Sequence, residues 1–338
     1  MPAARSFGCK VFAMIISRGA ALLALVLARC GPGGEASAPA APAASASSAG
    51  ATAGFPRELE LPDGGTLTLS APPQRVVASA AGLGDLLCEL LPPARLAGLP
   101  DQMRDYSGHR EPGDPYLARP TFHVFAAEAV LALQPDLVVA DRWSELEARQ
   151  RLLAAGVPVL TIGRLERLVD VRSTWRLLAR ALGEEARGEQ LVAELDARIA
   201  ALAAAPGART GLRALAYTNG GTGGWVAGSG TTADDWLALA GLVNAAADRP
   251  GHTRFDFEDL LVLDPDVVVV PGSDDPNELG GTARLVGSDP ALAGLRARRR
   301  GLIVALPGWL FSTNSQHIVT AAEELARRLD AQLAQAPP

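Results

Sequence analysis

Aromatic residues and histidines are scarce in this sequence: aromatic side chains make up 5% of the chain, and there are four histidines. A site for a bare zinc or manganese ion gathers three or four histidine, aspartate and glutamate ligands. The histidines are scattered and no histidine-rich loop occurs. This disfavours a bare-metal site, although His109, His123 and His252 are still able to converge in space.

Motifs typical of catalysis and of nucleic-acid binding are also missing. No Gly-x-Ser-x-Gly or His-Glu-x-x-His motif occurs, and Gly82-Leu-Gly84, between a predicted strand and helix, lacks the third glycine of a dinucleotide fingerprint. The net charge is -6 and the basic residues are dispersed, apart from a short run, Arg296 to Arg300, which we interpret as a solvated turn. The sequence therefore predicts neither an enzyme nor a nucleic-acid-binding protein.

The amino-terminal segment, residues 1–30, is typical of a secretory signal. Basic residues precede the apolar stretch 19–28, which is too short to span a bilayer. Translation starting at Met14 instead of Met1 would leave an even more typical signal. We therefore expect an exported protein, placed in the periplasm or on the outer face of a membrane.

The three cysteines fall in different parts of the chain. Residues 27–31, Leu-Ala-Arg-Cys-Gly, resemble a lipobox in which Cys30 is acylated, except that Arg29 stands where a small residue is expected. With Cys9 removed and Cys30 acylated, Cys88 has no disulfide partner, and we interpret it as a small buried hydrophobe. Residues 31–54 are almost entirely Ala, Pro, Ser and Gly, which predicts a disordered linker between the anchor and the folded part.

The remainder of the chain alternates short apolar runs with helical patterns. Residues 55–74 predict a hairpin around a Pro-Asp-Gly-Gly turn. Strands at 75–79, 96–99, 137–140 and 157–162 and helices at 82–91, 126–133 and 144–155 form a predicted N-terminal lobe, residues 75–166. Strands at 212–217, 267–270 and 302–305, a glycine-rich loop at 219–230 and helices at 233–242 and 315–333 form a predicted C-terminal lobe, residues 206–335. The fold class is α/β, with two Rossmann-like lobes and mainly parallel sheets.

A long helical pattern lies between the two lobes. It extends over about 35 residues within 167–205, with a glycine at 183. At 1.5 Å per residue it would span on the order of 50 Å, more than one lobe needs. We predict one long rigid helix that joins the lobes.

An internal repeat relates the lobes to one another. Segments 128–139 and 258–269 match without a gap at Glu, two Leu, Pro, Asp and two Val. Each predicts a short helix stopped by proline and followed by a buried strand. Glu128 and Glu258 open these helices, where the macrodipole favours a carboxylate by about 0.3–1 kcal/mol. That accounts for the residue type without any function, but it also predicts one exposed acidic side chain on each lobe.

The chain from about Pro73 to Leu329 resembles the iron-complex and vitamin B12 binding proteins of ABC importers, the class III periplasmic binding proteins. The resemblance is carried by segments 73–79, 133–139 and 321–326. It implies a monomeric receptor, with no cofactor of its own, that delivers heme, a ferric siderophore or cobalamin to a permease dimer and its ATPase. In that family an acidic residue of each lobe seats in a basic pocket of the permease, and the match selects Glu128 and Glu258.

The ligand is expected between the lobes, because open α/β lobes bind ligands at the carboxyl ends of their strands. The candidate ligand-binding residues are Ser79, Tyr106, His123, Trp143, Arg164, Trp225, His252, Trp309 and Phe311, most of them in predicted loops. His123 lies near the position of an iron-ligating tyrosine of the heme receptors and is the candidate metal ligand. A zinc or manganese receptor, or a stand-alone ligand sensor of the same fold, remains as an alternative.

Overall fold

The computed structural model describes residues 54–62, 64–221, 223–273 and 280–335. The predicted signal (1–30), the acylation of Cys30 and the linker up to residue 53 lie outside the described residues. Within these ranges no helix combines the length and the apolar character that crossing a membrane requires.

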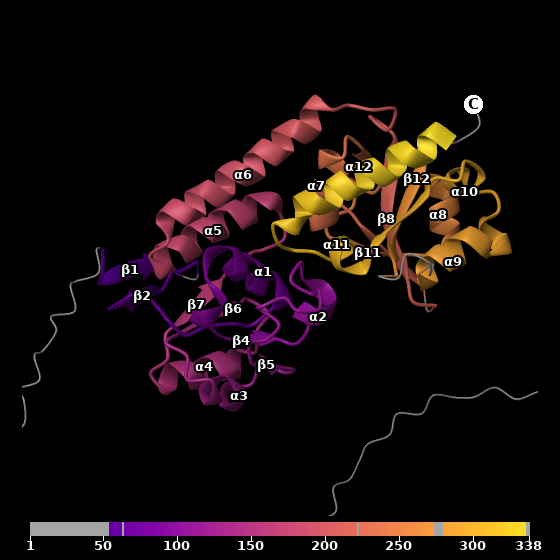
Figure 1. Ribbon diagram of the computed structural model, residues 1–338. Helices are drawn as coiled ribbons and strands as arrows, with labels where there is room; N and C mark the ends of the chain where they lie inside the picture. The colour runs from indigo at the N-terminus through magenta and orange to yellow at the C-terminus, as the bar shows by residue number, and fades with distance from the viewer. Residues whose placement is uncertain (1–53, 63, 222, 274–279, 336–338) are drawn as a thin grey trace, which may run out of the picture. The chain divides into compact units, whose positions relative to one another are not determined.

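The N-lobe contains a five-stranded parallel sheet in the order β5-β4-β3-β6-β7 (Figure 1). Its strands are β3 (Val76–Ala78), β4 (Leu96–Pro100), β5 (Thr121–Phe122), β6 (Leu137–Asp141) and β7 (Val159–Ile162). Its helices are α1 (Ala81–Leu90), α2 (Met103–Tyr106), α3 (Ala127–Ala132) and α4 (Leu146–Ala154). The expected antiparallel hairpin, β1 (Arg57–Glu60) and β2 (Thr66–Leu69), precedes it. Strands β3, β4 and β6 are buried on both faces, as a parallel sheet covered by helices requires.

The C-lobe combines a parallel sheet with an antiparallel extension. Strands β8 (Arg213–Asn219), β12 (Val267–Gly272) and β13 (Ile303–Pro307) are parallel, and β10 (Val243–Asn244) pairs with β8. Strands β9 (Gly224–Ala227) and β11 (His252–Phe255) add to β8 in antiparallel fashion. The helices are α7 (Thr232–Leu239), α8 (Phe257–Leu263), α9 (Gly281–Ser288), α10 (Arg296–Arg299), α11 (Gly308–Phe311) and α12 (His317–Gln335).

Strand β9 corrects the prediction of a glycine-rich loop at 219–230. A Cβ on Gly224 would lie 2.2 Å from the ring of Tyr217, so this glycine lets β9 pass close over β8. The local sequence is too rich in glycine to show a strand pattern, and the pairing depends on a neighbour that the pattern does not contain. Trp225 therefore lies on β9, and His252 lies on β11, the strand that pairs with β9, instead of in loops.

The single helix predicted over 167–205 is two antiparallel helices, α5 (Leu168–Leu182) and α6 (Glu185–Ala204). The reversal occurs at Gly183, which caps α5 in the left-handed conformation with φ 77°. Ion pairs between the helices, Arg172 with Asp196 and Arg176 with Glu189, follow the antiparallel register. A periodic pattern with one glycine does not distinguish a kink from a full reversal.

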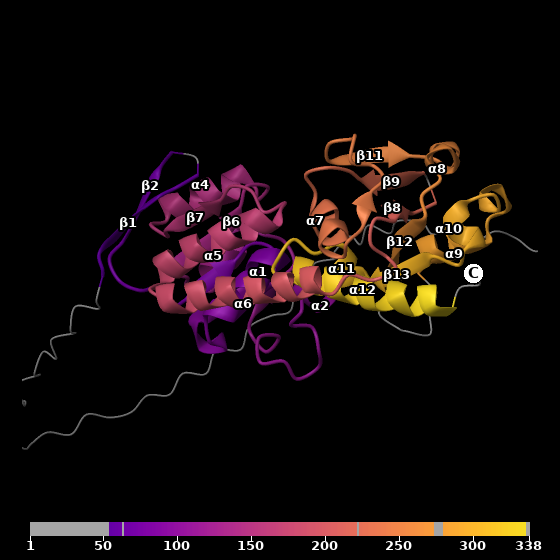
Figure 2. The ribbon, with the colours of Figure 1, turned by 90° about the horizontal axis from the view of Figure 1, so that it is seen from above.

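Helix α6 reaches both lobes, as Figure 2 shows. Arg187 donates a hydrogen bond to the carbonyl of Glu89 in α1 (3.1 Å), and Arg198 pairs with Glu323 in α12 at 2.6 Å. Its 20 residues span about 30 Å rather than the predicted 50 Å. The largest hydrophobic cluster also continues from the N-lobe sheet through α5 and α6 to α7 and α12. Helix α6 and this hydrophobic cluster are therefore common to both lobes.

The duplicated segment has a structural role that is the same in both lobes. Asp136 accepts a hydrogen bond from the backbone N–H of Arg75 (2.8 Å), and Asp266 accepts one from the N–H of Arg213 (3.0 Å). Each of these arginines in turn donates to carbonyls at the end of α3 or α8. Burial tends to raise the pKa of Asp266, but the Arg213 N–H and the Arg296 guanidinium lower it below its ordinary value. The recurrent Pro-Asp thus joins a helix end to the start of the neighbouring strand.

Candidate functional site

A cleft of about 700 Å³ lies between the lobes, within the range of roughly 300–1,000 Å³ that ligand sites occupy. The N-lobe contributes the segments that follow β6 and β7, and the C-lobe contributes β8, β9, the start of α7, the start of β11 and the segment after α11. The lining residues are Arg142, Trp143, Leu165, Glu166, Ala216, Thr218, Trp225, Val226, Ala227, Gly230, Thr231, Thr232, Ala233, Gly251, His252, Phe311, Ser312, Thr313 and Asn314. This is the expected position, at the carboxyl ends of parallel strands.

Each lobe presents a tryptophan to this cleft. Trp143, from the N-lobe, is 76% exposed, and Trp225, from the C-lobe, is 50% exposed. The guanidinium of Arg142 lies 4.4 Å from the centroid of the Trp143 ring. Aromatic rings that are at least half exposed on two walls of one cleft offer flat apolar surface for a planar ligand to stack on.

The antiparallel extension of the C-lobe places His252 in the same wall as Trp225. Trp225 is paired with Thr218 on one side and with Arg254 on the other, and His252 lies opposite Ala227. Because alternate residues of a strand point to the same face, Thr218, Trp225 and His252 share the face that lines the cleft. An imidazole and an indole ring therefore lie on the same face, at diagonal positions of neighbouring strands.

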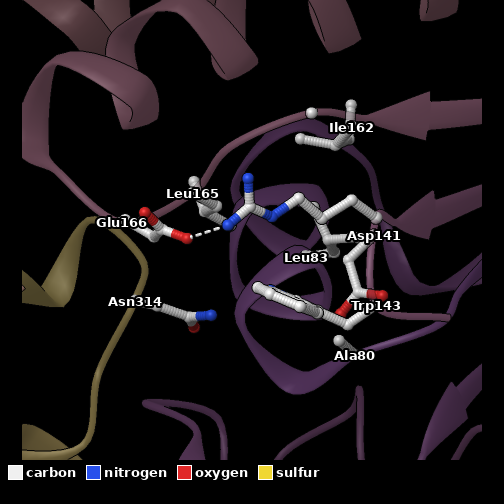
Figure 3. Close-up of a pocket in the computed structure, with 10 residues that line it drawn as sticks. Ala80, Leu83, Asp141, Trp143, Ile162, Leu165, Glu166 and Asn314 are labelled. Atoms are coloured by element: carbon white, nitrogen blue, oxygen red, sulfur yellow. Dashed lines mark hydrogen bonds and ion pairs between the residues drawn. The ribbon is translucent and has the colours of Figure 1, made fainter. Parts of the chain in front are cut away.

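The cleft lining contains one arginine, Arg142, and one carboxylate, Glu166, and these two side chains pair with each other. Arg142 and Glu166 are hydrogen-bonded at the edge of a small pocket of about 30 Å³, where Asn314 faces Leu83 and Trp143 (Figure 3). The other polar side chains of the lining are the His252 imidazole and a set of hydroxyls and one amide, contributed by Thr218, Thr231, Thr232, Ser312, Thr313 and Asn314. The cleft is thus suited to a large ligand with many hydrogen-bonding groups and few charges.

Four of the nine predicted ligand-binding residues line this cleft: Trp143, Trp225, His252 and Phe311. Two others lie at its border. Arg164 is exposed and pairs with Glu166 (3.1 Å), and the hydroxyl of Ser79 accepts a hydrogen bond from the N–H of Asp141 (3.0 Å). The latter contact ties β3 to the end of β6.

The remaining three, His123, Tyr106 and Trp309, lie outside the lining. The side chain of His123 is 85% exposed and its Nδ1 lies 2.8 Å from Asp101 Oδ2, so the candidate metal ligand is not brought to the cleft. Tyr106 ends α2 and is exposed. Trp309 is in α11, with the Arg110 guanidinium 4.7 Å from its ring centroid and the His317 ring edge-on at 5.1 Å. It packs against the core, which is the ordinary role of an aromatic side chain that covers apolar residues.

The glycines of Gly82-Leu-Gly84 are explained by close packing. A Cβ on Gly82 would lie 2.0 Å from Oδ1 of Asn314, and one on Gly84 would lie 2.5 Å from the sulfur of Met103. Gly82 therefore allows the C-lobe segment that carries Asn314 to approach α1. Packing, without any nucleotide, is sufficient to account for this pair.

The two predicted docking residues occupy equivalent positions with different surroundings. Glu128 and Glu258 are each the second residue of an exposed helix start. Arg151 pairs with Glu128 at 2.8 Å, and the pKa of Glu128 is lowered, first by a hydrogen bond from its own backbone and then by Arg151. Glu258 borders a hollow of about 540 Å³ together with Asp256 and Phe257.

Some lining residues were not found from the sequence. Arg142 and Glu166 were missed because their pairing joins residues 24 positions apart. Thr231 was missed as a cleft residue although a signal was present, since it caps α7 by accepting a hydrogen bond from Asp234 N–H (3.2 Å). A Thr-x-x-Asp sequence after a strand places a helix start near the carboxyl edge of the sheet.

Fold and cleft together define a two-lobed binding protein, and the chain belongs to the periplasmic binding protein family, which matches residues 118–309. It is 29% identical over 211 residues to the cobalamin-binding protein of Halobacterium salinarum, covering 60% of this chain and 55% of that protein. It is 23% identical over 208 residues to the uncharacterized ABC transporter substrate-binding lipoprotein YvrC of Bacillus subtilis, covering 60% of this chain and 64% of that one. The matched part is thus less than two thirds of either relative.

Among solved structures, the periplasmic heme-binding protein BhuT in complex with two hemes is 27% identical with a TM-score of 0.64, covering 77% of this chain and 98% of that chain. The predicted fold class is confirmed.

Proposed function

We propose that this protein is the extracytoplasmic solute receptor of an ABC importer and that it binds a planar metal complex, with a corrinoid such as cobalamin favoured over heme. The observation that carries the proposal is the cleft between the lobes, with a tryptophan from each lobe and a histidine on the same sheet face as one of them. The balanced charge of the lining favours the corrinoid, because the carboxylates of heme would need unpaired cations. The likeness to a cobalamin-binding protein supports this choice, and the likeness to BhuT supports heme as the second candidate.

Each cleft residue has a distinct part in this proposal. Trp143 and Trp225 stack against the macrocycle, and His252 ligates the metal through an imidazole nitrogen. The hydroxyls and the Asn314 amide bind the polar groups at the ligand's edge. A bare-ion receptor has less support, because in the described part of the chain no three His, Cys, Asp or Glu side chains gather as a metal site requires.

Absorption spectroscopy tests the ligand class and the ligating residue. The protein is incubated with cobalamin, hemin or a ferric siderophore, separated from free ligand, and its spectrum recorded. We expect cobalamin to be retained, and His252→Ala to shift its bands. His123→Ala is the matched control, because that histidine is exposed and lies outside the cleft, and it leaves the spectrum unchanged. Retention of none of the three compounds at micromolar concentration would show the ligand class to be wrong.

The partner is proposed from the two helix starts that carry Glu128 and Glu258. Each carboxylate seats in a basic pocket of one subunit of a permease dimer, whose ATPase drives import. The location outside the cytoplasm and the anchoring of the chain through Cys30 belong to the same proposal. The double variant Glu128→Arg/Glu258→Arg is expected to bind its ligand as the wild type does and to abolish uptake. Unchanged uptake in that variant would refute the docking role and would favour the stand-alone sensor.

A further inference from the structure

A buried carboxylate lies at the junction of the two lobes, outside the cleft lining. Asp85, on α1, is 1% exposed. Its Oδ1 accepts hydrogen bonds from Ser107 Oγ (2.5 Å) and from Gly108 N–H (3.2 Å), and its Oδ2 accepts one from Ser315 Oγ (3.0 Å). Ionised groups are rarely buried unless several donors compensate for the water they lose, so this site is a specific feature of the fold.

The donors to this carboxylate come from both lobes. Ser107 and Gly108 belong to the N-lobe, whereas Ser315 belongs to the C-lobe, immediately before α12. The C-lobe side is reinforced by Gln316, whose amide nitrogen lies 3.4 Å from the Asp85 carbonyl, and by His317, whose Nε2 lies 3.7 Å from Oδ1. Asp85 is therefore a point at which one charged group holds both lobes.

The same contacts lead directly to the wall of the cleft. Residues 311–314 line the cleft, and Ser315 follows them without a break. The hydroxyls of Ser315 and Thr313 lie 3.2 Å apart, and Ser315 N–H donates to Thr313 Oγ1 (3.3 Å). One helical turn before Asp85, Gly82 leaves the space that Asn314 occupies. One face of α1 thus contacts residues 314–317 over one turn.

We infer that Asp85 is the positioning residue of the cleft: its carboxylate holds the C-lobe wall 311–314 against α1 and thereby sets the spacing between the walls that carry Trp143 and Trp225. This rests on the proposed function only in taking the cleft as the binding site. Hydrogen bonds to an ionised acceptor are roughly twice as strong as neutral ones, which suits a contact that must resist relative motion of two lobes.

The structure offers a matched pair of variants for the test. Ser315→Ala removes the hydrogen bond from the C-lobe to Asp85, and Ser107→Ala removes a hydrogen bond to the same carboxylate from within the N-lobe. Both serines are fully buried, so each variant loses one buried hydroxyl that bonds to Asp85. Asp85→Asn provides a second, isosteric change should Ser315→Ala fail to fold.

The readout is the distance between spin labels on the two lobes, placed at the exposed positions Leu153 and Val243. The full chain is used with Cys9 and Cys30 replaced by serine. Cys88 stays, because it is buried and burial raises the pKa of its thiol well above the ordinary value. We expect one narrow distance in the parent and in Ser107→Ala, and a loss of that narrow distribution in Ser315→Ala and Asp85→Asn. An unchanged distance in both of the latter variants would overturn the inference.

Titration with cobalamin separates this inference from the proposed function. Affinity is expected to fall about tenfold in Ser315→Ala, the order that one hydrogen bond to a charged group contributes, and to be retained in Ser107→Ala. If cobalamin does not bind the parent while the distances respond as described, the ligand is wrong and the positioning role stands. If cobalamin binds Ser315→Ala and the parent equally, Asp85 does not set the geometry of the cleft.

Discussion

Replacement of Gly228 by alanine should strongly destabilise the C-lobe wall of the cleft. A Cβ at this position would lie 1.8 Å from the backbone oxygen of Arg249 and 2.9 Å from that of Ala246. The obstacle is main chain, so no side-chain rotation relieves it. Two segments cross here, held by hydrogen bonds from Gly228 N–H to Gly251 (2.8 Å) and from Ser229 N–H to Arg249 (2.8 Å).

The magnitude follows from these contacts. Overpacking a filled site costs about 1–3 kcal/mol, and separating the crossing segments removes hydrogen bonds that contribute about 1 kcal/mol each. We therefore expect Gly228→Ala to lower the free energy of unfolding by about 3 kcal/mol or more. For a chain of this size, that lowers Tm by about 5–10 °C.

Urea and thermal unfolding followed by circular dichroism measure the effect. The matched control is Gly287→Ala, on the exposed surface of α9, where a Cβ meets no atom within 4 Å. Alanine is the better helix former by up to about 1 kcal/mol, so this control is expected to be neutral or stabilising. Equal stability of the two variants would refute the argument that the crossing at Gly228 excludes a side chain.

Three further predictions concern charge and packing. The pKa of Asp266 is lowered in the folded state, so its contribution to stability is complete above its ordinary pKa of about 3.9 and is lost as pH falls through the lower folded value. Asp266→Asn should therefore be less stable than wild type by about 1–2 kcal/mol in urea at pH 7, with the difference narrowing toward pH 3. Arg151→Gln releases Glu128 from its intramolecular partner and should strengthen binding to the proposed permease partner, measured by surface plasmon resonance at low salt. Gly82→Ala should be destabilising when Asn314 is present and neutral in the Asn314→Ala background, as measured by a double-mutant cycle in urea.

Each of these three predictions has a result that would contradict it. A stability difference between wild type and Asp266→Asn that is constant from pH 7 to pH 3 would exclude linkage through this carboxyl group. Weaker binding of Arg151→Gln would mean that Arg151 supports docking rather than competing with it. For Gly82→Ala, an equal loss of stability in the wild-type and Asn314→Ala backgrounds would show that the added methyl group does not clash with Asn314.

Much of the fold could be predicted because its signals are local. Runs of Val and Leu at 137–140 and 267–270 indicate buried strands, and a proline two residues before each run stops the preceding helix. Two features of the fold were not predicted, and each has a physical reason. The reversal at Gly183 depends on how α5 packs on α6, and β9 depends on the ring of Tyr217, which lies on another strand. Neither neighbour contributes to a pattern within the segment itself.

The kinds of residue in the candidate site could be predicted from the sequence, but the particular residues that line the cleft could not. The rule that ligands bind at the carboxyl ends of strands selected Trp143, Trp225 and His252, and the structure brings these three residues to the cleft lining. The same rule selected Tyr106 and His123, which lie outside the cleft lining. The pattern within each segment does not show which strand ends meet across the cleft.

Local patterns were enough to predict a two-lobed α/β protein with a duplicated helix-strand unit, because periodicity, proline stops and repeats are properties of neighbouring residues. Tertiary structure decided which side chains form the cleft and what charge it carries. It pairs Arg142 with Glu166, brings His252 to the same sheet face as Trp225, and joins α1 to the C-lobe through Asp85. These contacts link residues tens to hundreds of positions apart, and they exist only once both sheets and α6 have folded.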